Sequence, residues 1–213
     1  ALAGSLAATS AFAGALDVTG TAKVVYASQD ESDTTGNPWS MNQGIAFGGS
    51  GDLDNGWTAT VSYELDGGAF DDEKLKLDMG ELGEFQYGES ASGYGIDIAS
   101  NMVPAVDTAI YSSVGTDTIA YGVARSAQDV GNLGWKKAMD GGITVAAEYA
   151  RNTAAGGSDT TFGLTYTGMD NLTLAAGVGS TSTGGTAEVE SQTYGAKYVT
   201  GGWTIGLQIT SVD

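Results

Sequence analysis

Cysteine and histidine are both absent from this 213-residue sequence, and their absence removes several kinds of chemistry at once. Without cysteine the fold has no disulfide bond and no thiolate to act as nucleophile or metal ligand. Without histidine there is no Ser-His or Cys-His catalytic pair and no imidazole to ligate zinc or haem. Pairs of carboxylates remain, but at this acidity they arise by chance. We therefore predict that the protein is not an enzyme and holds no cofactor or metal.

Basic and apolar residues are also scarce. Lys and Arg number 8 against 26 Asp and Glu, which gives a formal net charge of −18. Such acidity argues against nucleic acid as a partner, because phosphate binding needs a basic patch. About one residue in five is Leu, Ile, Val or Phe, a share that is typical of disordered chains when net charge is high. No apolar run approaches the roughly 18 residues of a transmembrane helix.

What the sequence does contain is regular alternation, and residues 41–66 show it most clearly. From Trp57 to Leu65 every second residue is apolar, and the residues between them are polar. A period of two is typical of a strand with one apolar face and one wet face. The Asp-Leu-Asp-Asn-Gly cluster at 52–56 supplies the turn of a hairpin.

The same alternation recurs along the chain and predicts an all-β, antiparallel fold of about eleven strands. The strands approach the roughly 9–11 residues that cross a bilayer when tilted, and short turns alternate with longer loops. A transmembrane barrel also explains the low apolar content, because its interior is aqueous. The expected strands are 17–27, 41–50, 56–66, 72–79, 84–88, 131–139, 143–151, 159–167, 172–180, 189–199 and 203–211.

Two stretches depart from this pattern. Residues 1–13 are rich in small apolar residues and end in Ala11-Phe12-Ala13, which is typical of a signal peptide with an A-x-A cleavage site. We expect residues 1–13 to be a partial signal peptide and residues 14–213 the barrel domain; the alternative is a short apolar helix of the folded protein. Residues 89–130 have no clear periodicity, and so long a segment inside a regular β array is usually functional or disordered.

Four segments carry a resemblance to a known family: GSGDLDNGWTATVSYELDGG, MGELGEFQYGE, MDGGITVAAEYA and TYTGMDNLTLAAGVG. They resemble the general porins of Gram-negative bacteria, most of all those of marine alphaproteobacteria of the SAR11 type. The resemblance implies a sixteen-stranded homotrimeric channel that ends on an aromatic residue, so this chain would be a C-terminally incomplete piece. In such porins the third external loop folds into the lumen. The acidic residues that correspond to this constriction loop are Glu89, Asp97, Asp107, Asp117 and Asp129.

Alternation assigns the charged residues of the strands to the lumen, since Lys or Arg facing lipid at the midplane costs about 2–4 kcal/mol. The expected pore-lining residues are Lys23, Glu64, Lys74, Lys76, Asp78, Glu84, Glu148 and Lys197. The dense arginine ladder of the family is missing, because Arg125 and Arg151 are the only arginines. The acidic balance predicts a mild preference for cations. The competing expectation is an anion-preferring pore with its lysines at the constriction.

Aromatic residues separate this interpretation from its alternative, a non-channel sheet of the envelope or exterior that is adhesin-like or binds Ca²⁺ through acidic loops. A barrel places aromatic residues in girdles at the membrane interfaces, whereas a soluble sandwich buries them between two sheets. The expected girdle residues are Tyr26, Trp57, Tyr63, Phe85, Tyr87, Trp135, Tyr149 and Trp203. We therefore predict a porin of the bacterial outer membrane, whose partners are membrane lipid and small hydrophilic solutes and ions.

Overall fold

The computed structural model describes residues 17–26, 39–66, 69–88, 93–100, 102–103, 131–152, 157–182 and 188–213. They form eleven strands that are hydrogen-bonded in chain order within one sheet. The predicted all-β, antiparallel class is therefore confirmed. The predicted signal peptide, and the acidic residues Glu89, Asp107, Asp117 and Asp129, lie outside the described residues. Within the described residues, no helix is long and apolar enough to cross a membrane.

The strands follow the predicted ranges closely. The largest difference is at the fourth strand, which begins at Ala69 instead of residue 72, because a run of acidic residues hides the alternation there. The strands are β1 (Asp17–Tyr26), β2 (Trp39–Asp52), β3 (Thr58–Asp66), β4 (Ala69–Asp78), β5 (Glu84–Gly88), β6 (Asn132–Met139), β7 (Ile143–Asn152), β8 (Gly157–Met169), β9 (Leu172–Ser182), β10 (Val189–Thr200) and β11 (Trp203–Val212). Two short 3-10 helices, η1 (Gly80–Leu82) and η2 (Gly95–Ala99), complete the described elements.

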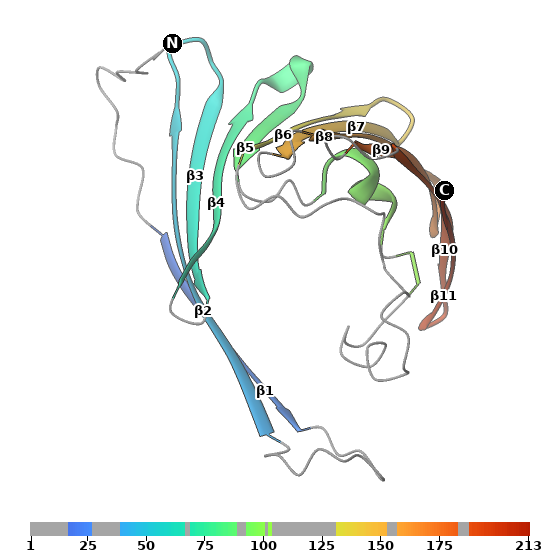
Figure 1. The fold of residues 1–213 in the computed structure, drawn as a ribbon, viewed down its shortest axis with the longest axis horizontal. Coiled ribbons are helices and arrows are strands. Elements are labelled where there is room, and N and C mark those ends of the chain that lie inside the picture. Colours follow the sequence, from blue (N-terminus) through green and yellow to red (C-terminus); the bar gives the residue numbers. More distant parts are fainter. Residues whose placement is uncertain are drawn as a thin grey trace. The chain divides into compact units, whose positions relative to one another are not determined.

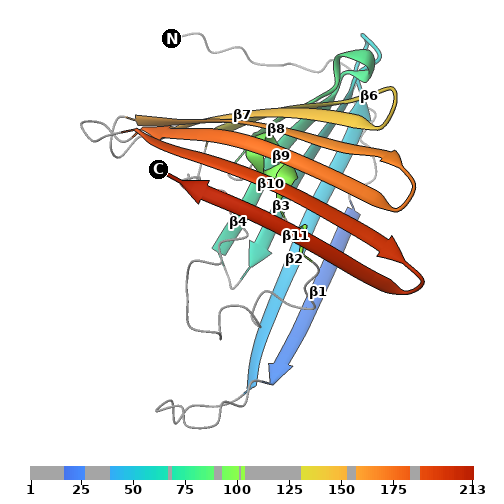
Figure 2. The ribbon, with the colours of Figure 1, turned by 90° about the vertical axis from the view of Figure 1, so that its right-hand side faces the viewer.

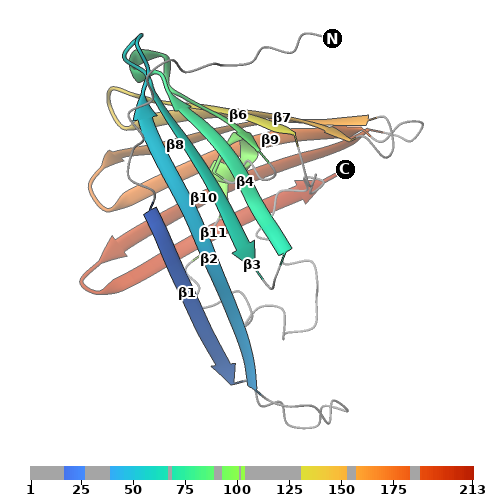
Figure 3. The ribbon, with the colours of Figure 1, turned by 90° about the vertical axis from the view of Figure 1, so that its left-hand side faces the viewer.

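The chain divides into two compact units, Ala1–Lys76 and Leu77–Asp213. In the first unit β1, β2 and β3 lie side by side (Figure 3). The predicted turn after β2 is closed by the Gly56 N–H, which donates to the Leu53 carbonyl at 2.8 Å, and by the Leu53 N–H, which donates to the Trp57 carbonyl at 2.7 Å. Gly56 has a φ of 81°, a conformation that glycine adopts without strain.

In the second unit β7 to β11 run side by side as a meander (Figure 2). Its tight turns use residues that tolerate positive φ: Gly141 and Gly142 after β6, Asn171 after β8, and Gly201 and Gly202 after β10. β8 runs on to Met169, with a register shift against β9 between Tyr166 and Met169. The residues predicted as a four-residue turn at 168–171 are therefore partly strand.

The unit's sheet has two unlike faces. On one face the large apolar side chains are exposed, among them Phe162 at 55%, Val178 at 47% and Leu207 at 61%. On the other face Thr161 and Thr193 are buried, and η2 lies against it, on the concave side of β6–β11 (Figure 1). An apolar face that remains exposed needs a nonaqueous neighbour, because monomeric soluble proteins rarely expose such a continuous area.

Candidate functional site

The polar face is built by strand register. Glu148 on β7 pairs with Thr161 on β8, Thr161 pairs with Gly179 on β9, and Gly179 pairs with Ser191 on β10. Successive strand residues point to opposite faces, so the residues directly before and after each of these in the sequence point toward the apolar face. The row thus crosses four strands on one face, and Glu148, Thr161 and Ser191 are all buried.

Four glycines on this face make room for the segment around η2. We call them the glycine seat: Gly134 on β6, Gly163 on β8, Gly177 on β9 and Gly195 on β10. A Cβ added at Gly134 would lie 2.6 Å from Cγ of Tyr94, and one added at Gly177 would lie 2.6 Å from Cγ1 of Ile96. At Gly163 and Gly195 an added Cβ would come closer still, to the Gly95 carbonyl and the Met102 side chain. The backbone at all four has ordinary strand φ, so glycine is needed there for space.

Hydrogen bonds hold η2 on the seat. The Ile96 N–H donates to Oγ1 of Thr161 at 3.0 Å, and the Thr161 hydroxyl donates to Oε2 of Glu148 at 3.4 Å. Ile96 is fully buried and Thr161 nearly so. A buried backbone donor is costly when unpaired, by about 1–3 kcal/mol, so the Thr161 hydroxyl favours the docked position of η2.

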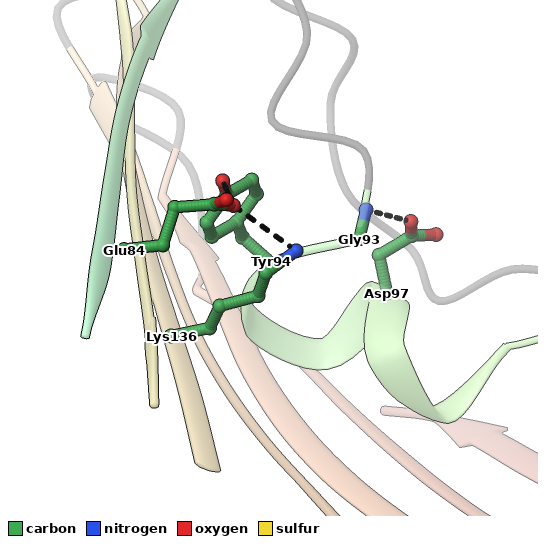
Figure 4. Close-up of polar contacts among 5 residues, drawn as sticks. All are labelled: Glu84, Gly93, Tyr94, Asp97 and Lys136. Carbon is green, nitrogen blue, oxygen red and sulfur yellow. Dashed lines mark hydrogen bonds and ion pairs between the residues drawn. The ribbon is translucent and has the colours of Figure 1, made fainter. Parts of the chain in front are cut away.

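A second attachment, which we call the tyrosine anchor, consists of Glu84, Tyr94 and Lys136 (Figure 4). The Tyr94 hydroxyl donates to Oε1 of Glu84 on β5, which also lies 3.2 Å from Nζ of Lys136 on β6. The same ammonium group lies 4.6 Å from the centroid of the Tyr94 ring. Burial raises the pKa of Tyr94 well above its ordinary value, and the hydrogen bond to Glu84 and the charge of Glu84 raise it further. The phenol therefore stays a hydrogen-bond donor at every physiological pH.

Five of the residues predicted to line a pore lie on the polar faces of their units. In the first unit Lys23 and Glu64 lie on one face, because Lys23 pairs with Asn42, and Glu64 with Ala46, two positions of equal parity on β2. In the second unit Glu84, Glu148 and Lys197 lie on the face that receives η2. Lys74 and Lys76 alternate along β4 with Leu75 and Leu77, and both lysines are half-buried.

Two predicted residues have local roles that the sequence did not reveal. Asp78 ends β4, and its carboxylate accepts the Gly80 N–H at 2.9 Å, which stabilises the turn into η1. Asp97 lies within η2 and accepts the Gly93 N–H at 2.6 Å, so it orders the start of the docked segment (Figure 4).

Tyr94, Lys136, Thr161 and the glycine seat were not predicted as site residues. Alternation could have identified Lys136, because it follows Trp135, which was assigned to the apolar face, and therefore falls on the polar face. The seat had a weaker signal, because its glycines fall at polar-face positions of their strands. Nothing in the sequence pairs these positions with the segment around residue 95.

The aromatic residues predicted for the girdle lie mostly on the apolar faces. Phe85 pairs with Trp135, and Tyr87 and Tyr149 both pair with Leu133. Trp203, which begins β11, is 75% exposed. In the first unit Tyr63 pairs with Phe47, the Tyr26 ring lies 4.9 Å from that of Trp39, and Trp57 flanks the turn before β3. Trp135 has one more role, because its indole N–H donates to the Leu82 carbonyl at 2.9 Å.

An antiparallel meander with an exposed apolar face, and a segment docked on its polar face, is typical of outer-membrane β proteins. The entire chain, residues 1–213, matches the family model of the Gram-negative porins. The protein therefore belongs to the Gram-negative porin family and is located in the bacterial outer membrane. No curated protein matches it.

Solved structures share this fold at low sequence identity. The chain is similar to a loop L8 deletion mutant of OmpT, an outer membrane protein of Vibrio cholerae, with a TM-score of 0.64 and 14% identity over 93% of this chain and 69% of that one. In-vitro folded OmpT has a TM-score of 0.62 and 14% identity, over 92% of this chain and 63% of that one. A double mutant of the Rh. blastica porin has a TM-score of 0.54 and 11% identity, over 93% of this chain and 85% of that one. At these identities the likeness concerns the fold alone.

Proposed function

We propose that this porin is a passive diffusion channel that admits small hydrophilic solutes and ions, with a mild preference for cations. The observation that carries the proposal is the position of η2, docked by side-chain hydrogen bonds on the polar face of a sheet whose other face is apolar and exposed. A segment held against the wet side of a barrel wall narrows the aqueous path, and narrowing gives a channel its size limit.

Charge sets the proposed ion preference. Lysines are interleaved with carboxylates on the polar faces, as in the Glu84–Lys136 ion pair, and they offset part of the negative charge of the strands. The whole chain, however, carries a formal charge of −18. Negative charge along a narrow aqueous path concentrates cations and repels anions. Because the lysines offset part of this negative charge, the preference is mild.

The finer assignments belong to this proposal. The pore-lining residues are Lys23, Glu64, Lys74, Lys76, Asp78, Glu84, Glu148 and Lys197, to which we add Lys136. The segment after β5 is the constriction loop, the outward aromatic residues form the girdles, and the assembled protein is a homotrimer without enzymatic activity. The relation to porins of the SAR11 type is likewise proposed, from the resemblance of the turn segments.

The alternative of a calcium-binding or adhesin-like sheet has no observation in its favour among the described residues. Among the described residues, no three Asp or Glu side chains come close enough together to hold a metal ion. The Asp52-to-Gly56 segment is a hairpin turn in which the Asp52 carboxylate accepts the Thr58 hydroxyl at 2.9 Å.

Liposome swelling tests the proposal. We expect proteoliposomes that contain the full-length porin to swell in isotonic neutral sugars at rates that fall steadily with sugar size and do not saturate with concentration. Liposomes with heat-denatured protein are the control. Proteoliposomes that stay impermeable to the smallest sugar would contradict the proposed channel.

A further inference from the structure

At the glycine seat, four strands of the wall have no side chain at the position where the segment around η2 lies. Tyr94, Gly95, Ile96 and Met102 occupy these positions in turn as the segment crosses from β6 to β10. The residues that fill the seat are among the most buried of the described residues, with Tyr94 at 1%, Ile96 at 0% and Met102 at 5%. The backbone of the segment therefore lies as near to the wall as side-chain packing allows.

The wall is the stiff partner in this contact. β8 is hydrogen-bonded along its length to β7 and β9, and β9 to β8 and β10. A strand paired on both sides moves only if its neighbours move with it. η2 is a single short element of five residues, and hydrogen bonds from Tyr94, Ile96 and Met102 attach its segment to the wall. A side chain added to the wall is therefore accommodated by displacement of η2 away from it.

We propose that the glycine seat sets the distance of η2 from the barrel wall and thereby the largest solute that the channel admits. The inference rests on the proposed channel function and adds the residues that determine its size limit. The glycines act through η2, so they are positioning residues and need not touch the solute.

The displacement expected from one methyl group follows from the distances. At Gly177 an added Cβ would lie 2.6 Å from Cγ1 of Ile96, whereas ordinary van der Waals contact begins at 3.4 Å. The Ile96 Cα would also lie only 3.2 Å away, so the Ile96 side chain and the backbone of η2 are both displaced toward the aqueous side, the side chain by up to about 1 Å. Gly163 requires a larger movement, since there the obstacle is the Gly95 backbone carbonyl.

The test is a sugar-size series in liposome swelling with the full-length porin. Gly177→Ala is the main variant and Gly163→Ala the second. Gly20→Ala on β1 and Gly49→Ala on β2 are matched controls, because an added Cβ at either strand glycine meets nothing within 4 Å. The double variant Gly177→Ala with Ile96→Ala removes the clashing Cγ1 and tests for rescue.

We expect Gly177→Ala and Gly163→Ala to slow the larger sugars progressively while the smallest sugar still passes, with both controls at the wild-type size limit. In the double variant, Ile96→Ala should return the size limit of Gly177→Ala to that of the wild type. An unchanged or raised limit in folded Gly177→Ala would overturn the inference. If neither seat variant folds, the single variant Ile96→Ala decides, because it removes side-chain atoms at Gly177 and lets η2 lie closer to the wall. A lowered solute size limit in Ile96→Ala would be evidence against the role of the seat. Wild-type protein that passes no sugar would instead contradict the channel function itself.

Discussion

Removal of the Tyr94 hydroxyl should loosen η2 from the wall. Tyr94→Phe keeps the ring in its buried position but deletes the donor that bonds Glu84. A hydrogen bond to a charged group contributes about 1.5–3 kcal/mol. The side chains of Glu84 and Lys136 are 27% and 34% exposed, so water competes for them and lowers this contribution. A loss of about 1–2 kcal/mol raises the undocked population roughly 5- to 30-fold.

Hydrogen exchange measures that population. The Ile96 amide is hydrogen-bonded to Thr161 when η2 is docked, so it exchanges through the undocked state and its rate follows the undocked fraction. We expect the peptide that covers residues 93–100 to exchange faster by that factor in Tyr94→Phe. Tyr87→Phe is the matched control, because Tyr87 lies on the apolar side of β5 and is 49% exposed. Equal exchange rates in wild type and Tyr94→Phe would refute the anchoring role.

The same anchor predicts a pH dependence whose sign is fixed by the raised pKa of Tyr94. A group whose pKa is higher in the docked state stabilises that state fully at pH values below its ordinary pKa, here 10.0. This stabilisation is lost progressively as the pH rises above that value. Exchange of the Ile96 amide, corrected for intrinsic rate, should therefore be insensitive to Tyr94 up to about pH 10 and should accelerate above it. Tyr94→Phe should lack this acceleration, and its persistence in the variant would count against the assignment.

Three further predictions concern the two faces of the sheet. Replacing Lys74 and Lys76 by Glu should raise the permeability ratio of cations to anions without preventing assembly; failure to fold would mean that these lysines pack elsewhere. Leu164→Arg, on the apolar face, should cost about 2–4 kcal/mol of stability in the membrane, whereas Thr165→Arg on the polar face should fold normally; equal effects in denaturant titrations would argue against the assigned faces. Trp135→Phe should lower stability by about 0.5–1.5 kcal/mol, because it deletes the bond to the Leu82 carbonyl, with unchanged conductance; an unchanged denaturation midpoint would remove that role.

The strands were predictable because alternation determines both their extent and their faces. The run from Trp57 to Leu65 predicted β3 and its two faces, and Gly141, Gly142, Gly201 and Gly202 lie between expected strands, in tight turns that need positive φ. Local pattern suffices in these cases, since a slip of one residue would exchange the two faces. Polar stretches hid the alternation, as at the start of β4.

The docked segment was not predictable in the same way. η2 is too short to show a helical period, and what stabilises it lies far away in the sequence: Thr161 bonds the Ile96 amide, and Gly177 leaves room for the Ile96 side chain. Alternation placed Glu148 on the polar face but could not show that η2 covers it, leaving it 6% exposed. Tertiary contacts of this kind follow from the assembled sheet.

The central claim, a weakly cation-preferring aqueous pore, is tested most directly by the reversal potential of single channels in planar bilayers under a KCl gradient. At about 0.1 M salt the Debye length is ≈ 10 Å, and at 1 M it is ≈ 3 Å. We predict stepwise conductance with a reversal potential of cation-selective sign in dilute salt, which shrinks toward zero as both solutions are concentrated. A reversal potential of anion-selective sign in dilute salt would contradict the proposed preference, and the absence of conductance steps would contradict the pore.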